Sequence, residues 1–149
     1  MPNLEDIKRP VAAELKRYEE FLLESLQSDN QMVGGMLTHI FTNRGKAVRP
    51  LLALLSASLH AGGKPLPERS YLAAMILEMV HAASLVHDDV IDRSDMRRGR
   101  PSVNARWSRH SAVLIGDYIL ARSFSIGMES KQYDIVSYIS RRMNDLCEG

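Results

Sequence analysis

The chain has 149 residues, of which 45% are hydrophobic and 25% charged, and its formal net charge is +1. These values are ordinary for one globular domain, and they exclude a global electrostatic attraction to nucleic acid or to an anionic membrane. The single cysteine, Cys147, excludes an intrachain disulfide and suits the reducing cytoplasm, where we expect the protein to reside.

The N-terminal part of the chain predicts two helices. Apolar residues recur every three or four positions over residues 4–26, with charged residues between them, which is typical of an amphipathic helix. Pro10 is expected in its first turn, so that the residues before it form a separate piece. Asp29 or Asn30 can cap a second helix over about residues 30–41. No basic and apolar leader opens the sequence, so no signal peptide is expected.

A basic loop is expected over residues 43–48. Pro50 is predicted at the first position of the next helix, with Arg49 outside it, because a residue before proline disfavours helical backbone. Lys46 and Arg49 would then lie at a helix N-terminus, where free N–H groups and the helix dipole favour an anion such as a diphosphate. The alternative is a solvated basic loop.

The helix that follows is almost wholly apolar over residues 51–59, which predicts burial on most of its sides. Gly62 and Gly63 are expected to end it. This run is the longest apolar-rich stretch of the sequence and is far shorter than the roughly 20 residues of a membrane span, so we expect none.

A central helix is predicted from about Pro67 to Ile91, because apolar residues cover most of its circumference. His81, Ser84 and Asp88 are spaced by three and four, so they share one face of this helix. His81 lies about 10 Å along the axis from Asp88, given the rise per residue. It is therefore a candidate ligand for a diphosphate, although a histidine in a core helix is more often structural.

The end of this helix is acidic, and a basic run follows it. Asp88 and Asp92 are one turn apart, and Asp89 is turned away from Asp88 by about 100°. The carboxylates repel one another and lie where the helix dipole disfavours anions, so we expect a cation such as Mg²⁺ to bind them. Arg97 and Arg98 could hold a phosphate through paired hydrogen bonds. The alternative is a solvated acidic surface paired with these arginines.

The remaining sequence also predicts helices. Gly99 and Pro101 interrupt the helical pattern, Ser102 is expected to cap a short turn, and longer helices are expected over residues 109–128 and 132–147. No stretch alternates polar and apolar residues for long. The fold class predicted for residues 1–149 is therefore all-α.

Three of these features resemble motifs of the trans-type polyprenyl diphosphate synthases. Residues 43–50, NRGKAVRP, resemble the family's G-K-x-x-R-P motif, and residues 88–101, DDVIDRSDMRRGRP, resemble its first aspartate-rich motif. His81 also lies at the position where the family carries a histidine. The family needs a second aspartate-rich motif, which this sequence lacks, so the resemblance implies the N-terminal half of a helical bundle of the isoprenoid synthase type.

The resemblance implies a prenyltransferase. Such an enzyme condenses an allylic diphosphate, for example farnesyl diphosphate, with isopentenyl diphosphate in a head-to-tail 1'-4 reaction that requires Mg²⁺. By position, the implied metal ligands are Asp88, Asp89 and Asp92, the implied catalytic residues are Asp88, Asp92 and Arg97, and the implied substrate-binding residues are Lys46, Arg49, His81, Arg97 and Arg98.

Ala83 and Ser84 lie one turn below the carboxylates and are small. Short-chain members of the family tend to carry aromatic residues at these two positions, so the resemblance implies a long, octaprenyl-like product. The alternative is that both residues simply allow close helix packing.

Two other function classes compete with an active synthase. The chain alone is expected to be inactive without the second motif, and it could serve as a non-catalytic or partner-dependent subunit of a two-component enzyme. A nucleic-acid-binding module that uses the arginines over residues 93–109 is disfavoured, because the neighbouring carboxylates repel phosphate. We expect a homodimer, and we expect exposed apolar surface that promotes self-association.

Overall fold

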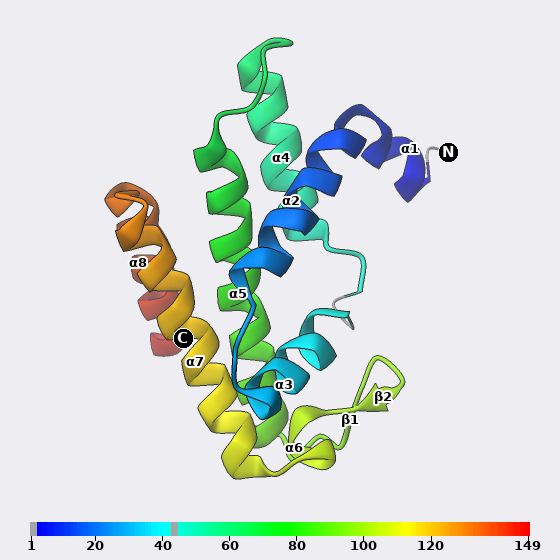
Figure 1. Ribbon diagram of the computed structural model, residues 1–149, viewed down its shortest axis with the longest axis vertical. Helices are drawn as coiled ribbons and strands as arrows, with labels where there is room; N and C mark the ends of the chain where they lie inside the picture. The colour runs from blue at the N-terminus through cyan, green and yellow to red at the C-terminus, as the bar shows by residue number, and fades with distance from the viewer. Residues whose placement is uncertain (1–2, 43–44) are drawn as a thin grey trace.

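The computed structural model describes residues 3–42 and 45–149, and these segments are almost entirely helical (Figure 1). This confirms the predicted all-α fold class. Beyond the helices, strands β1 (Met96–Arg97) and β2 (Arg100–Pro101) form a short antiparallel hairpin. The helices are α1 (Leu4–Lys8), a 3₁₀ turn (Arg9–Val11), α2 (Ala12–Ser25), α3 (Gln31–Thr42), α4 (Val48–Ala61), α5 (Glu68–Ile91), α6 (Val103–Arg106), α7 (Arg109–Glu129) and α8 (Tyr133–Glu148).

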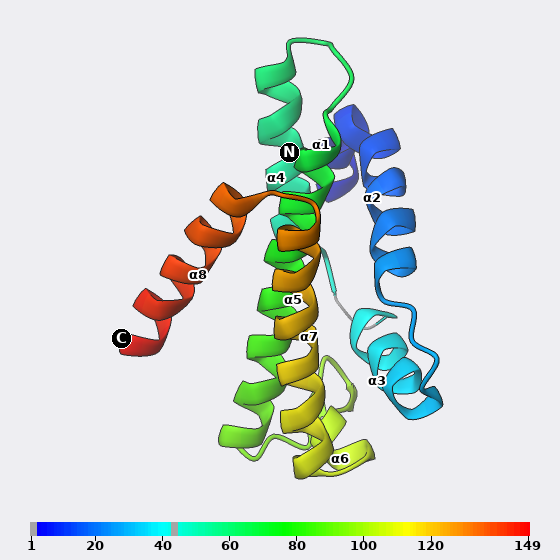
Figure 2. The same cartoon turned by 60° about the vertical axis from the view of Figure 1, so that its left-hand side comes forward.

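Helix α5 is the central element, as predicted, and is about 36 Å long at the standard rise per residue. Helix α7 packs along it, and α4 and α2 also contact it (Figures 1 and 2). Its side chains Met75, Ile76 and Met79 are fully buried. Among the described helices, α5 alone is long and apolar enough to cross a membrane, but 61% of the relevant window is buried inside the structure, as in a core helix.

The N-terminal helices follow the predicted boundaries. Pro10 lies in the 3₁₀ turn that separates α1 from α2. The side chain of Asn30 caps α3, since its Oδ1 accepts hydrogen bonds from the backbone N–H groups of Met32 and Val33 at 3.0 and 3.1 Å. These contacts satisfy donors that the first turn of a helix leaves free.

Helix α4 differs from the prediction in two respects. It begins at Val48, so Arg49 is helical and Pro50 is its third residue rather than its first. The first turn has no helical partners for its N–H groups, so proline is tolerated there. The predicted burial on most sides is also wrong, because Leu52 and Leu59 are 58% and 84% exposed. Gly62 ends the helix in left-handed backbone, as expected.

The β1–β2 hairpin was not foreseen from the sequence. Each strand has only two residues, which is too short to show alternation of polar and apolar side chains. The two residues between the strands, Arg98 and Gly99, have φ of 52° and 77°. Positive φ at both positions is what a two-residue type I′ turn requires. The turn therefore sets the direction in which the hairpin carries Arg97 and Arg98.

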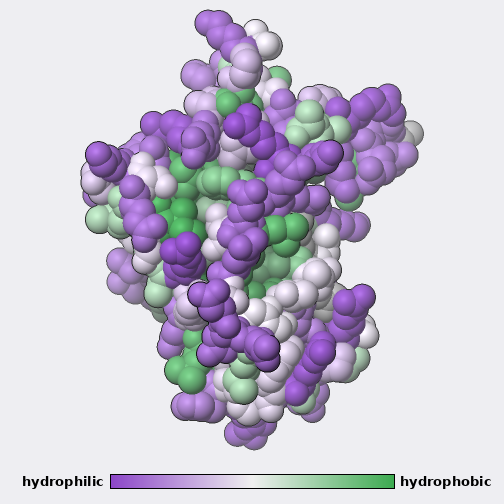
Figure 3. All heavy atoms as spheres, viewed as in Figure 1, coloured by the Kyte–Doolittle hydropathy of each residue, from purple (hydrophilic) through white to green (hydrophobic). Residues whose placement is uncertain are grey.

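Helix α8 stands apart from the rest of the bundle. It joins the end of α7 and then diverges from α5 and α7 toward its C-terminal end (Figure 2). Ile139 is buried, whereas Tyr138 and Leu146 are 66% and 73% exposed. On the face that Figure 3 shows, hydrophobic side chains reach the surface in patches within a mostly polar exterior.

Candidate anion and metal site

Four helices, α4, α5, α7 and α8, meet at one groove. The first turn of α4 brings Arg49, and the C-terminal half of α5 brings His81, Ser84 and Asp88, to the lining of a groove of about 540 Å³. Thus Arg49, His81 and Asp88, which were predicted separately from two motifs, share one site. The opposite wall is largely apolar and comes from α7 and α8, through Leu120, Tyr138, Ile139, Met143 and Leu146.

A second, much smaller cavity lies between α3, α5 and the hairpin. Its volume is about 60 Å³, and its lining includes His81, Asp89, Arg97 and Arg98. His81 borders both this cavity and the larger groove. The arginines of the hairpin and the arginine of α4 therefore approach the same histidine from two directions.

The charges of these arginines act on the pKa of His81. Burial lowers the pKa of its imidazole below the ordinary value of 6.5, and the positive charges of Arg49, Arg98 and Arg97 lower the pKa further, against the opposing effect of Asp88. The neutral form of the ring is therefore favoured. A site with three guanidinium groups around a neutral imidazole is prepared for an anion with several oxygen atoms.

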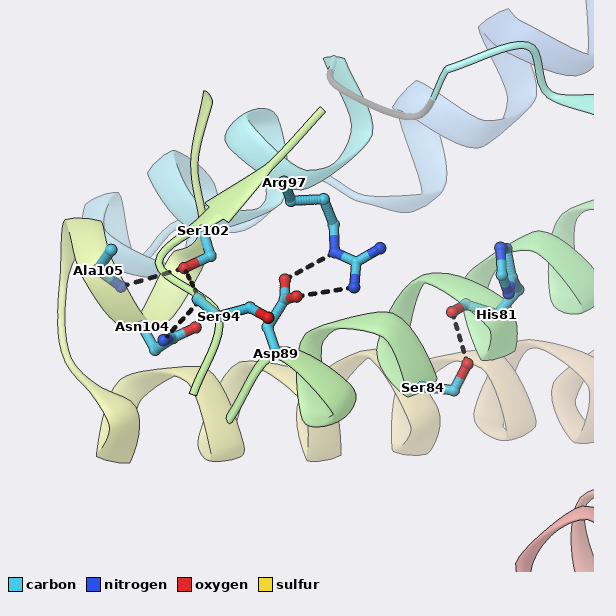
Figure 4. A network of polar contacts seen from close by, with 8 residues as sticks. All are labelled: His81, Ser84, Asp89, Ser94, Arg97, Ser102, Asn104 and Ala105. Atoms are coloured by element: carbon cyan, nitrogen blue, oxygen red, sulfur yellow. Dashed lines mark hydrogen bonds and ion pairs between the residues drawn. The ribbon is translucent and has the colours of Figure 1, made fainter. Parts of the chain in front are cut away.

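Asp89 and Arg97 form a bidentate ion pair (Figure 4). Arg97 donates from Nε and Nη2 to the two carboxylate oxygens of Asp89, both at 2.7 Å. The Asp89 side chain is 5% exposed and that of Arg97 is 34% exposed. The hydrogen bond to Asp89 raises the pKa of Arg97. Both oxygens of Asp89 are thus engaged by a cation already, which the spacing of the motif did not reveal.

Asp88 and Asp92 are exposed at the end of α5, where Asp92 is the C-terminal cap. Within residues 3–42 and 45–149, no three His, Cys, Asp or Glu side chains converge to hold a metal ion. Two carboxylates suit Mg²⁺ nonetheless, because this ion is usually held by one or two carboxylates together with substrate phosphates. Asp88 and Asp92 therefore fit such an ion, whereas both oxygens of Asp89 are paired with Arg97.

Gly45 has a role that sequence reasoning missed. A Cβ atom at this position would lie 1.2 Å from Nη1 of Arg98, and the residue has φ of +63°. The loop before α4 and the turn of the hairpin are therefore in direct contact, and only glycine leaves room for the guanidinium. The glycine of the motif over residues 43–50 was the signal from which this close contact could have been inferred. Asn43 and Arg44, which precede it, lie outside the described residues.

The other predicted residues, Ser84, Ala83 and Lys46, lie in different surroundings. Ser84 lines the large groove, and its hydroxyl donates to the carbonyl of His81 at 2.8 Å. Ala83 is fully buried in the core, which supports the alternative of close helix packing at this position. Lys46 is exposed in the turn before α4, and it lines neither of the two cavities.

His87 and Glu78 are two further polar residues of α5. The ring of His87 packs against Gly116 of α7, where a Cβ atom would lie 2.2 Å from Nε2. Its Nε2 is 3.2 Å from the carbonyl oxygen of Val113. Glu78 is buried and lines the small cavity together with Arg97 and Arg98.

Comparison with known proteins gives one consistent family. Residues 30–149 match the family described as polyprenyl synthetase. The chain is 36% identical to the all-trans-nonaprenyl-diphosphate synthase (geranyl-diphosphate specific) of Rhodobacter capsulatus over 97% of its length, and 35% identical to the octaprenyl diphosphate synthase of Haemophilus influenzae over 99%. It spans 44% of each of these relatives.

The fold is likewise similar to solved structures. A polyprenyl synthase from Caulobacter crescentus, complexed with calcium and isoprenyl diphosphate, matches with a TM-score of 0.86 and 26% identity. The match covers 98% of this chain and 44% of that protein. The isoprenoid synthase fold and the polyprenyl synthetase resemblance predicted from the three motifs are therefore confirmed.

Proposed function

The chain belongs to the polyprenyl synthetase family, and we propose that its site holds isopentenyl diphosphate beside a magnesium-bound allylic diphosphate for head-to-tail prenyl transfer. One observation carries this proposal. His81 borders both the groove that Arg49 and Asp88 line and the cavity that Arg97 and Arg98 line, so residues of two separate motifs meet at one histidine. A single prepared anion site between two motifs is what such a reaction requires.

Arg49, His81 and Arg98 are proposed to bind the diphosphate of isopentenyl diphosphate. Arginine matches phosphate oxygens through two parallel N–H groups, which orients the substrate as well as binding it. Holding the two reactants in fixed geometry supplies a large part of the rate in a bimolecular reaction. The exposed Lys46 would contribute at the rim, as a point charge.

Asp88 and Asp92 are proposed to hold Mg²⁺. When bound, this ion would neutralise charge that develops on the leaving diphosphate. Asp89 is proposed to act differently from the other two carboxylates, by fixing the guanidinium of Arg97 from within the protein. Arg97 then faces the anion site already oriented, so that little entropy is lost when substrate binds.

A long-chain product is proposed from the character of the large groove. Ser84 leaves it open below the carboxylates, and its other walls are mainly apolar, as an isoprenoid chain requires. The names of the relatives, nonaprenyl and octaprenyl diphosphate synthase, support the same expectation.

A second candidate function follows from the length of the match. The chain spans less than half of its relatives, and the apolar wall of α8 is open to solvent. We propose that the 149 residues alone turn over little substrate, and that a partner-dependent or non-catalytic chain of a two-component synthase is the alternative. If the chain is one part of a synthase, adding a complementary polypeptide should restore turnover. If it is a non-catalytic subunit, the partner should carry the catalytic residues and need this chain only for binding.

A homodimer in the cytoplasm is also proposed. Leu114, Tyr118 and Met128 of α7 are exposed and recur at intervals that place them on one helix face. An apolar stripe of this kind fits a symmetric contact between two copies. Sedimentation equilibrium of the wild type and of Tyr118→Glu would test it, since the substitution should yield monomers.

Calorimetric titration of the folded chain with isopentenyl diphosphate tests the anion site. Arg49→Gln should weaken binding about tenfold, because a hydrogen bond to a charged group contributes roughly 1.5–3 kcal/mol. Arg141→Gln, an exposed arginine on α8, is the matched control and should leave the affinity within about twofold. Equal losses in the two variants, or no binding by the wild type, would contradict the proposed site.

The metal proposal has its own measurement. Affinity for farnesyl diphosphate should rise when Mg²⁺ is added, and Asp88→Asn should remove that increase. Incubation with labelled isopentenyl diphosphate, farnesyl diphosphate and Mg²⁺ should give little product from the chain alone. Robust polyprenyl product would show that residues 1–149 suffice for catalysis.

A further inference from the structure

A cluster of polar and aromatic side chains joins α3 to the hairpin, outside the residues that the mechanism uses. At its centre is His39 of α3. Its Nε2 is 2.8 Å from the carbonyl oxygen of Pro101 in β2, and its Nδ1 is 3.0 Å from Nη1 of Arg106 in α6. The rings of His39 and Trp107 meet edge to face with centroids 5.3 Å apart, and the Arg106 guanidinium lies 4.8 Å from the Trp107 ring centre.

The two hydrogen bonds fix the tautomer of His39. A guanidinium only donates, so Nδ1 must accept from Arg106. A carbonyl only accepts, so Nε2 must carry the hydrogen and donate to Pro101. The two partners therefore assign the ring hydrogen to Nε2. This arrangement uses both ring nitrogens to connect three elements that are distant in sequence.

The contact matters because of what the hairpin carries. Pro101 pairs with Met96 and Arg97 pairs with Arg100, so the strand that His39 holds is registered directly against the strand of Arg97. A hairpin with two residues in each strand has little stability of its own. Its position must come from external contacts, which here are His39 on β2 and the Asp89–Arg97 pair on β1.

His39 also borders the site itself. It lines the small cavity of about 60 Å³ together with His81, Arg97 and Arg98. We propose that His39 is a positioning residue for the anion site: by fixing β2 from α3, it holds the hairpin where Arg97 and Arg98 face the diphosphate. This rests on the proposed function only in naming the diphosphate, since the mechanical role of His39 is independent of any ligand.

A pair of variants tests this role. His39→Phe keeps a ring against Trp107 but removes both hydrogen bonds, whereas His39→Gln keeps one donor and one acceptor at a similar reach. Without ligand, hydrogen exchange should be measured at the Ser102 amide, which donates to Asp95 at 2.9 Å across the base of the hairpin. We expect His39→Phe to accelerate this exchange about tenfold and His39→Gln less than about threefold.

Two further readouts complete the test. Imidazole nitrogen shifts of the wild type should show the Nε2–H tautomer, and affinity for inorganic pyrophosphate should fall about tenfold in His39→Phe but not in His39→Gln. Unchanged exchange in His39→Phe, equal losses in both variants, or faster exchange without loss of pyrophosphate affinity would overturn the proposal. If the wild type itself binds no pyrophosphate, the proposed function fails, whereas the exchange data still decide whether His39 holds the hairpin.

Discussion

At the β1–β2 hairpin, polar contacts hold each strand in place, whereas helix α8 leaves apolar side chains in open solvent. The hairpin is fixed by the bidentate Asp89–Arg97 pair and by His39, and the loop at Gly45 touches its turn. Along α8, Ile139 is buried but Tyr138 and Leu146 are not. Contacts within the chain thus anchor the hairpin, whereas part of the apolar face of α8 stays exposed.

The difference has a physical basis. Directional contacts between charged groups can be satisfied locally by a few residues of one chain, as at the hairpin. An apolar groove needs neighbours along its whole length to exclude water, so it depends on how many helices surround it. The diphosphate binding and the prenyl-chain groove that we propose are therefore separable, and we expect that each can be disturbed without the other.

The largest effect is expected from breaking the contact that anchors β1. Asp89→Asn removes the charge that holds Arg97 and should lower the free energy of unfolding by about 2 kcal/mol, since a cation that is only one-third exposed loses its partner. Urea unfolding measures this. Asp92→Asn, an exposed carboxylate at the end of the same helix, is the control and should cost little. Equal costs would show that the hairpin is not anchored by Asp89.

A second substitution separates backbone strain from collision with Arg98. Gly45→Ala and Gly62→Ala both place alanine at positive φ and should each cost about 1 kcal/mol, but Gly62 has no neighbouring atom within 4 Å. Only Gly45→Ala displaces the guanidinium of Arg98, so only this variant should lose affinity for pyrophosphate, by about tenfold in calorimetric titration. Normal affinity in Gly45→Ala would place Arg98 outside the anion site.

A smaller effect concerns pH. The pKa of His81 is lower in the folded chain than in the unfolded chain. As the pH falls toward the ordinary pKa of histidine, the unfolded chain therefore binds more protons than the folded chain. The free energy of unfolding should therefore decrease from about pH 7.5 to about pH 5.5, and this decrease should be smaller in His81→Gln. Paired denaturation curves provide the measurement, with the exposed His60→Gln as control. Identical slopes in all three proteins would contradict the arginine-rich environment of His81.

The smallest effect on stability is expected at the apolar wall. Leu146→Ser should change the free energy of unfolding by less than about 0.5 kcal/mol, because the side chain is already exposed. It should nevertheless reduce self-association beyond the dimer proposed at α7, measured as sedimentation mass over a range of concentrations. Leu59→Ser, at an exposed leucine on α4, is the comparison and should leave association unchanged. If Leu59→Ser reduced association and Leu146→Ser did not, the associating surface would lie on α4 rather than on α8.

The sequence by itself determined the helices and the family. Apolar periodicity and the capping residues Asn30 and Ser102 predicted helix positions to within a few residues, because these signals are local. The three motifs identified the family, and spacing along α5 placed His81, Ser84 and Asp88 on one face. Local geometry of a helix suffices for these inferences.

Only the tertiary structure decided which partners meet. The pairing of Asp89 with Arg97, the contact between Gly45 and Arg98, and the burial of Ala83 each depend on how separate elements pack. The exposure of α8 has the same origin, since an amphipathic pattern shows which face is apolar but not whether a neighbour covers it. Distances between segments are set by packing of the whole bundle, and spacing along one chain carries no information about them.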